Sequence, residues 1–391
     1  MQNASYRDTW VEISLDAIQA NVKAFKDCMR PKSKFMAVVK ADGYGHGAVE
    51  VGNAALRAGA DYLAVALLDE AIELRKKGIK SPILVLGYTG LVSPTALMEA
   101  IKNDITLTIF TEDIAKQIVK TAVELEHSVK VHIKIDSGMN RIGLRDKDEV
   151  LKLTQLLQSK FVQIEGIYTH FSDADNPDPS YTYKQFEVFK AITSYLEVNG
   201  IHIPIKHCCN SAATISYPEM HLDMVRVGIS LYGLYPDNHL RDKITLKQAM
   251  SFKTKAVMIK TVESGNPISY GCTYTPSENA IIATIPVGYA DGFSRSLSNK
   301  GHVTVNGKRV PIVGRICMDQ SMIDITTLKE VNMDDEFVIF GDSGDGLIPL
   351  SEIADLLDTI HYEIVCLIGK RVPRVYIQGG QVAVARGLLS R

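Results

Sequence analysis

Short apolar runs alternate with amphipathic, helix-type segments through the first part of the chain. Eight runs rich in Val, Ile and Leu have the length of strands, and helical patterns such as residues 112–127 separate most of them. Continuously apolar runs of this kind are typical of a parallel sheet that is covered by helices. The expected strands lie at residues 35–40, 62–67, 82–87, 105–110, 130–136, 162–169, 205–210 and 224–228.

These strand–helix units predict an α/β fold whose N-terminal part is a (β/α)₈ TIM-like barrel. A doubly wound open sheet is the alternative that the same alternation allows. A first helix is expected after Ser14, a suitable N-cap, because Ile18, Val22 and Phe25 recur behind it at helical spacing.

Strand-like segments dominate the rest of the chain, which predicts a second, mainly β domain. Asn306-Gly307 stands between two of these segments and is a strong signal for a type I′ hairpin turn. One helix is expected at roughly residues 351–359. The expected strands lie within residues 256–262, 280–289, 302–314, 320–326 and 336–341.

We therefore expect two domains, a barrel at residues 1–240 and a mainly β domain at residues 241–391. The strand-like segment 10–15 precedes the barrel pattern, and it is a candidate to pair with the second domain. This arrangement would bring the beginning of the chain and its last part together.

The composition excludes several classes of function. A net charge of −2 over 391 residues gives no basic excess that would suit a nucleic acid. No segment reaches the about 18 apolar residues of a membrane helix, and the N-terminus lacks the pattern of a secretory signal. Six cysteines without a C-x-x-C pair indicate reduced thiols in a cytoplasmic protein. No His or Cys cluster has ligand spacing, so no metal site is expected.

Polar residues follow several of the expected barrel strands, at the end where barrel enzymes have their active sites. Lys40 is followed by a run with three glycines, which indicates a loop that needs backbone freedom or approaches a ligand closely. Each residue also has a structural reading: a solvated lysine, a hydrogen-bonded histidine, a buried arginine with a partner. The set comprises Lys40, Arg141, His170, Asn210, Ser211, Arg226 and Gly228.

Schiff-base chemistry on a phosphorylated cofactor would use all of these residues. A lysine amine in a pocket of low dielectric loses its proton more easily and can react with an aldehyde. A phosphate requires hydroxyl groups and backbone N–H groups, which Tyr44, Ser211, Gly228 and Ile229 could supply.

The chain resembles the alanine racemase family of fold type III pyridoxal-phosphate enzymes. The signature AVVKADGYGHG at residues 37–47 contains Lys40, and further similar segments follow in order through both expected domains. They include KIDSGMNRIG (134–143), YTHFSDAD (168–175), HCCNSAA (207–213), RVGISLYG (226–233), ISYGCTY (268–274), PVGYADG (286–292), VGRICMDQ (313–320) and HYEIVCLIGKRVPR (361–374).

The resemblance implies a homodimer with shared active sites and a two-base racemisation of alanine. Lys40 would bind pyridoxal 5'-phosphate and act on the D enantiomer, and Tyr270 of the other subunit would act on the L enantiomer. Two bases on opposite faces of the substrate can each move one proton, whereas a single base would have to change faces. The D-alanine would supply peptidoglycan synthesis.

The remaining roles are also implied by the resemblance alone. Arg141 and the backbone of Met318 would bind the substrate carboxylate. Lys134, often carbamylated in the family, would support Arg141, and His207 would support Arg226. The residues expected to contact the cofactor are Lys40, Tyr44, His170, Asn210, Ser211, Arg226, Gly228, Ile229 and Tyr362.

Three other functions stay open at this point. The family includes serine-accepting members, although Tyr362 and Met318 favour a pocket that suits a methyl group. A barrel-type pyridoxal-phosphate decarboxylase would share both domains, but it should have an acid where Arg226 stands. A non-catalytic cofactor-binding protein would not need the second domain or Tyr270.

Overall fold

The computed structural model describes residues 5–89, 94–341 and 347–390. The chain folds into two compact units. The barrel unit contains Ile18–Gly43 and Ala48–Leu246, and the β unit contains Met1–Ala17, Tyr44–Gly47 and Lys247–Arg391. The division differs from the expected one because the first residues of the chain and a short segment after Lys40 belong to the β unit.

The barrel unit contains an eight-stranded parallel sheet, which confirms the expected barrel rather than the open sheet. The order is β8-β7-β6-β5-β4-β3-β2-β9. Asp223 N–H donates to Lys206 O at 3.1 Å and Arg226 N–H donates to Cys209 O at 3.1 Å, which connects the two end strands. The strands are β2 (Lys34–Val38), β3 (Tyr62–Val65), β4 (Ile83–Val85), β5 (Ile105–Ile109), β6 (Val129–Lys134), β7 (Val162–Tyr168), β8 (Ile205–His207) and β9 (Met224–Val227).

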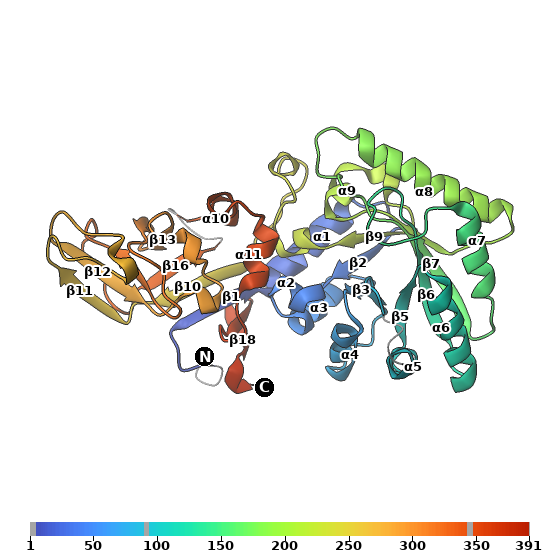
Figure 1. Cartoon of the computed structure of the whole chain (residues 1–391), viewed down its shortest axis with the longest axis horizontal. Coiled ribbons are helices and arrows are strands. Elements are labelled where there is room, and N and C mark those ends of the chain that lie inside the picture. Colours follow the sequence, from blue (N-terminus) through green and yellow to red (C-terminus); the bar gives the residue numbers. More distant parts are fainter. Residues whose placement is uncertain (1–4, 90–93, 342–346, 391) are drawn as a thin grey trace. The chain divides into compact units, whose positions relative to one another are not determined.

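Helices lie outside these strands (Figure 1). The first begins after Ser14, whose Oγ accepts the N–H of Ala17 at 3.1 Å, as the N-cap prediction requires. The strands bury Val, Ile and Leu side chains on both faces, which explains their continuous apolar runs. The helices are α1 (Leu15–Cys28), α2 (Lys40–Tyr44), α3 (Ala48–Arg57), α4 (Leu68–Lys76), α5 (Pro94–Lys102), α6 (Glu112–Leu125), α7 (Lys147–Leu156), α8 (Ser180–Val198) and α9 (Ser211–Ser216).

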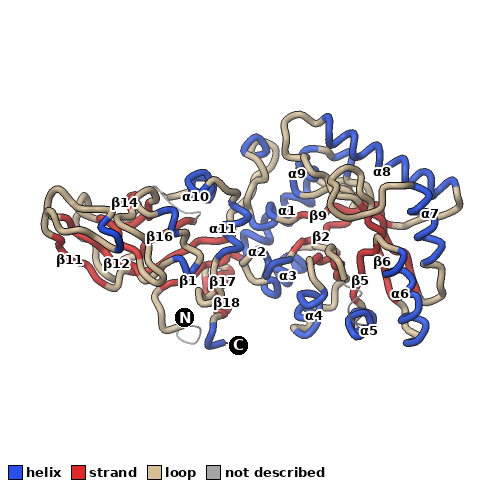
Figure 2. The backbone as a smooth tube through the Cα atoms, in the orientation of Figure 1, coloured by secondary structure: helices blue, strands red, loops and turns tan. Residues whose placement is uncertain are grey.

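The β unit is mostly strand and loop (Figure 2). Its larger sheet has the order β14-β13-β16-β10-β1-β17-β18, and its smaller sheet has the order β11-β12-β15. The prediction that residues 10–15 pair with this unit is confirmed, because β1 lies between β10 and β17. The strands are β1 (Thr9–Ser14), β10 (Met250–Lys255), β11 (Met258–Val262), β12 (Ala280–Ile285), β13 (His302–Val305), β14 (Lys308–Pro311), β15 (Ser321–Asp324), β16 (Glu336–Phe340), β17 (Arg374–Gln378) and β18 (Gln381–Arg386).

Local sequence signals account for only part of the β unit. Asn306 and Gly307 both have positive φ, 49° and 72°, as the type I′ turn requires. The helix expected near 351–359 is α10 (Leu350–Leu357), but α11 (His361–Leu367), which follows it directly, is not predicted by the pattern. The strands β10, β17 and β18 are also additional to those predicted. Within the described residues, no helix is both long and apolar enough to cross a membrane.

Candidate functional site

Four basic side chains lie close enough to His170, at the C-terminal end of the barrel strands, to affect its charge. Burial, followed by the charges of Arg226, Lys134, Arg141 and Lys40, holds the pKa of His170 well below the usual value for histidine. His170 is therefore neutral at pH 7. The structure thus brings together five of the residues that the sequence singled out, although each strand ends one to three residues earlier than expected.

Arg226, on β9, is the most enclosed of these cations, with 3% of its surface exposed. Its Nη2 donates to Thr169 O at 2.8 Å and to Cys208 O at 3.0 Å, with His170 Nδ1 at 3.2 Å. Its Nη1 donates to His207 Nδ1 at 2.9 Å. The described protein acceptors leave other N–H groups of this guanidinium for a ligand. A guanidinium keeps its protons, so the ligand atom must be an acceptor.

Lys134 ends β6 and is also buried. Burial, and then the charges of Arg226 and Arg141, hold the pKa of Lys134 well below the usual value for lysine, while Asp136 acts in the opposite direction. Its Nζ lies 4.7 Å from the centre of the Tyr168 ring. The positive charges of Arg226 and Arg141 favour anionic groups here, so the site fits a phosphorylated cofactor and a carboxylate substrate.

Lys40 begins a short turn of left-handed backbone. Ala41, Asp42 and Gly43 all have φ between 51° and 60°. This conformation is unfavourable for residues with a Cβ, and it occurs where surrounding contacts impose it. Ala41 N–H donates to Glu70 Oε1 at 2.6 Å, and Asp42 Oδ1 accepts the N–H of Ala48 at 2.9 Å. These two carboxylates hold the backbone that carries Lys40.

Ser211 and Gly228 meet after the last two barrel strands. The Gly228 N–H donates to Ser211 Oγ at 2.9 Å, and Ile229 follows at once in the chain. Asn210 is the N-cap of α9, because its Oδ1 accepts the N–H of Ala213 at 3.0 Å. Its Nδ2 donates to Phe171 O at 3.3 Å, so the side chain also connects α9 to the loop after β7. The cofactor contact of Asn210 stays a prediction.

The other expected site residues lie in the β unit. Burial, followed by the nearby Tyr362 and Cys366, raises the pKa of Tyr44, so these groups lie close together within that unit. Tyr270 is 71% exposed. It stands between Ser269 and Gly271, which have φ of 66° and 73°, so a strained turn presents the phenol to solvent.

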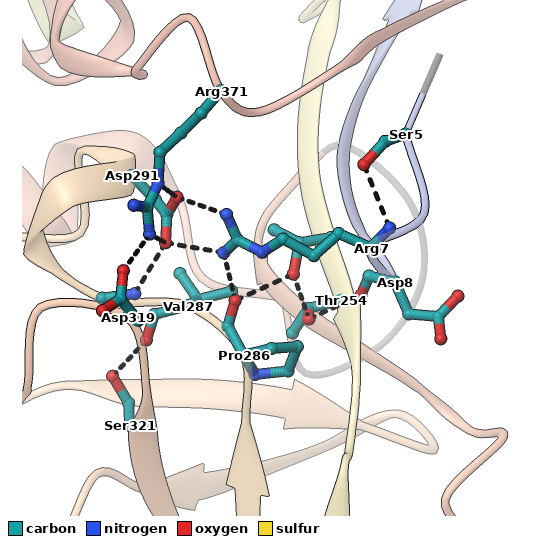
Figure 3. Close-up of polar contacts among 12 residues, drawn as sticks. Ser5, Arg7, Asp8, Thr254, Pro286, Val287, Asp291, Asp319, Ser321 and Arg371 are labelled. Atoms are coloured by element: carbon teal, nitrogen blue, oxygen red, sulfur yellow. Dashed lines mark hydrogen bonds and ion pairs between the residues drawn. The ribbon is translucent and has the colours of Figure 1, made fainter. Parts of the chain in front are cut away.

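An ion cluster around the buried Asp291 lies beside the loop that contains Asp319 (Figure 3). Asp291 is fully buried and accepts hydrogen bonds from Arg7 at 2.7 and 2.8 Å and from Arg371 at 2.7 Å. Arg371 also pairs with Asp319, the next residue after Met318. Met318 O accepts the N–H of Ala290 at 3.1 Å. The cluster therefore fixes the backbone around Met318.

Close packing at Gly288 completes this support. A Cβ on Gly288 would lie 2.3 Å from both Cys317 O and Met318 O, so any larger residue would displace the loop. Sequence reasoning does not identify the supporting residues of either unit. Their contacts are with other protein groups, and a single acid or histidine outside a recognisable motif carries no distinctive signal. These residues are Glu70, His132, Glu165 and Asp291.

Comparisons with known proteins agree with this geometry. The chain matches the alanine racemase N-terminal domain over residues 13–236 and the C-terminal domain over residues 249–376. It is 58% identical over 391 residues to alanine racemase 2 of Oceanobacillus iheyensis, covering 100% of this chain and 99% of that protein. It is 57% identical to alanine racemase 1 of the same organism, covering 96% and 100%.

A solved structure extends the likeness to three dimensions. The crystal structure of alanine racemase from Bacillus anthracis with bound L-Ala-P matches with a TM-score of 0.92 and 42% identity, covering 98% of this chain and 99% of that one. A basic site at the end of a parallel barrel, with a separate β unit, defines a barrel-type pyridoxal-phosphate enzyme. More specifically, the chain belongs to the alanine racemase family.

Proposed function

We propose that this chain interconverts L-alanine and D-alanine with pyridoxal 5'-phosphate as its cofactor. The observation that carries the proposal is the set of four basic side chains near the neutral His170, with Lys40 among them. Such a site attracts both the phosphate of the cofactor and the carboxylate of an amino acid. Close relatives named alanine racemase support alanine as the substrate.

Nine residues would hold the cofactor. Lys40 would bind it covalently, Arg226 would donate to its ring nitrogen and His170 would lie against the ring. The phosphate would be bound by Tyr44, Ser211, Gly228, Ile229 and Tyr362, and Asn210 would border the same site. When bound, the cofactor supplies an electron-withdrawing group that makes the Cα proton of the substrate more acidic.

The proton would be removed on one face of Cα and returned on the other. Lys40 would move the proton of the D enantiomer, and Tyr270 of the partner subunit would move that of the L enantiomer. The exposure of Tyr270 on a strained turn supports this role, because a phenol held outside its own unit can act on another subunit. A homodimer would then be obligatory for activity.

Arg141 and the backbone of Met318 would bind the substrate carboxylate. The exposed Arg141 lies close enough to Lys134 and His170 to affect both electrostatically. Lys134 would be carbamylated and would accept a hydrogen bond from Arg141. Tyr362 and Met318 would limit the space for the side chain, which favours alanine over serine. The product would supply peptidoglycan synthesis in the cytoplasm.

A decarboxylase is less consistent with the site. An acid at the ring nitrogen would be expected for that reaction, whereas Arg226 occupies the position and is held by backbone carbonyls and His207. Restoring an acid there would require removing several buried hydrogen bonds. A racemase with broader alanine and serine activity remains the second candidate.

Coupled D-amino-acid production from L-alanine and L-serine tests the proposal. Wild type should racemise alanine faster than serine, and Lys40→Ala should be inactive. Tyr270→Phe should fold normally and lose at least about a hundredfold in rate, because general base catalysis contributes that much. Wild-type protein that is purified with its cofactor but racemises neither substrate would contradict the proposal.

A further inference from the structure

A line of buried hydrogen bonds connects Arg226 to a carboxylate deep in the barrel unit. Arg226 Nη1 lies 2.9 Å from His207 Nδ1, and His207 Nε2 lies 2.9 Å from His132 Nδ1. His132 Nε2 lies 3.2 Å from Glu165 Oε2, and Lys130 Nζ lies 2.9 Å from Glu165 Oε1. Four different strands contribute these residues, and both imidazole rings are fully buried.

The backbone leaves room for this line. Gly166 is paired with His132 in the β6–β7 register. A Cβ on Gly166 would lie 2.5 Å from two atoms of the His132 ring, so a larger residue would displace the imidazole. The ring of His207 is stacked on Tyr168, with the centroids 4.7 Å apart and the planes at 14°. The two rings are therefore held in place by packing as well as by hydrogen bonds.

The groups at the two ends, Arg226 and Glu165, determine which atom donates in each hydrogen bond of the line. Arginine can only donate, so His207 Nδ1 must present its lone pair and carry its proton on Nε2. That proton is donated to His132 Nδ1, which leaves the His132 proton on Nε2. A carboxylate can only accept, and Glu165 receives this last proton. Burial, the largest influence on both histidines, lowers the pKa of each, which keeps them neutral.

This line does not deliver protons to the site. A guanidinium does not release its protons near neutral pH, so a proton entering from Lys130 or Glu165 would have no route beyond Arg226. What the line does supply is orientation. Both imidazole dipoles turn their lone pairs toward Arg226, and a negative charge stands at the far end. Such aligned groups in a low dielectric strengthen one another.

We propose that Glu165 is a positioning residue for Arg226. Through His132 and His207 it fixes the tautomer that accepts from the guanidinium, and so it fixes which N–H groups Arg226 presents to the cofactor ring. The contact with the ring rests on the proposed function, whereas the direction of the line depends only on the protein.

Nitrogen-15 NMR of the histidine side chains in the full-length enzyme, with and without cofactor, tests the direction first. His132→Gln and His207→Gln identify the signals. Wild type should show both rings neutral and protonated at Nε2. Protonated rings, or either proton on Nδ1, would overturn the proposal without any reference to activity, and a wild-type enzyme without racemase activity would leave this result intact.

Variants at the far end then test the effect on the reaction. Glu165→Met removes the acceptor of the His132 Nε2 proton and leaves Arg226 alone to favour this direction. A second tautomer should then become populated, first at His132, with a shifted absorption band of the bound cofactor and a kcat about tenfold lower at little change in KM. Glu165→Gln retains an acceptor and should restore most of each property. Lys130→Met is the matched control, because it removes a contact of Glu165 outside the line of histidines and should leave the histidine signals unchanged.

Two results from these variants would also overturn the proposal. One is a folded Glu165→Met protein whose histidine signals are unchanged. The other is changed signals together with wild-type kcat and cofactor absorption. If Glu165→Met does not fold, inverted tautomers and an unchanged rate in Glu165→Gln would overturn the proposal in the same way.

Discussion

The amine of Lys134 lies in a buried site beside two guanidinium groups, where an added positive charge is unfavourable. An ordinary lysine is protonated at neutral pH and reacts poorly with dissolved carbon dioxide. Because its pKa is lowered, Lys134 has an unprotonated amine at a pH where solvent-exposed lysines remain charged. Carbamylation would then convert the neutral amine into an anion that Arg226 and Arg141 can stabilise.

Enzyme equilibrated with ¹³C-bicarbonate should therefore give a carbamate resonance by NMR. Lys134→Arg keeps a basic side chain that cannot form the carbamate, so this variant should lack the resonance and should have a raised KM for alanine. The resonance should weaken as the pH falls, because the amine becomes protonated. Persistence of the same signal in Lys134→Arg would refute the assignment to this residue.

At the scale of elements, the left-handed turn after Lys40 depends on Glu70 at the start of α4. One carboxylate accepts from Ala41, and it also accepts from Ala66 and Leu67 at the N-terminus of the helix. The same side chain thus caps α4 and holds a strained backbone. Loss of the carboxylate should relax the turn and move Lys40.

Glu70→Ala is expected to lower kcat at least about tenfold, because small displacements of a reacting group are costly. It should destabilise the protein by about 1–2 kcal/mol through loss of the cap. Glu70→Gln keeps an acceptor oxygen and should retain most of the rate. Steady-state kinetics and urea unfolding measure both effects; a Glu70→Ala enzyme with wild-type kcat would show that the turn does not need this support.

The eight barrel strands can be predicted because their apolar residues are continuous, and the hairpin can be predicted because Asn306-Gly307 fits one turn type. The left-handed turn is only partly predictable. The glycines after Lys40 indicate backbone freedom, but Ala41 and Asp42 share the conformation, and only contacts with Glu70 and Ala48 explain it. Local sequence does not show which residue of another element a side chain will contact.

At the scale of the whole molecule, the N-terminal segment is tied to the β unit through Asp291. Burial alone would raise the pKa of Asp291, but hydrogen bonds from Arg7 and Arg371 hold it below the usual value for aspartate. The charged form is thus favoured in the folded state. The contribution of Asp291 to stability is fully present above the pKa that this aspartate has in the unfolded chain. It is lost as the pH falls through the lower pKa of Asp291 in the folded protein.

Asp291→Asn should destabilise the β unit by about 2–3 kcal/mol at pH 7, less than for a fully enclosed pair because both arginines are partly exposed. The difference from wild type should shrink below about pH 4, where the aspartate of the unfolded chain is protonated. Fluorescence of Trp10, the single tryptophan, follows unfolding from β1. An equal difference at pH 7 and at pH 3 would contradict this account.

Hybrid dimers show whether the groups of Lys40 and Tyr270 meet across two copies of the chain. Lys40→Ala and Tyr270→Phe chains with different tags would be co-expressed, and the heterodimer would be isolated. One of its two sites should be intact, so the heterodimer should have about half of the wild-type alanine racemase activity, while both parent dimers remain nearly inactive. A heterodimer that is stable, binds the cofactor and is as inactive as its parents would show that the two residues do not meet across two subunits.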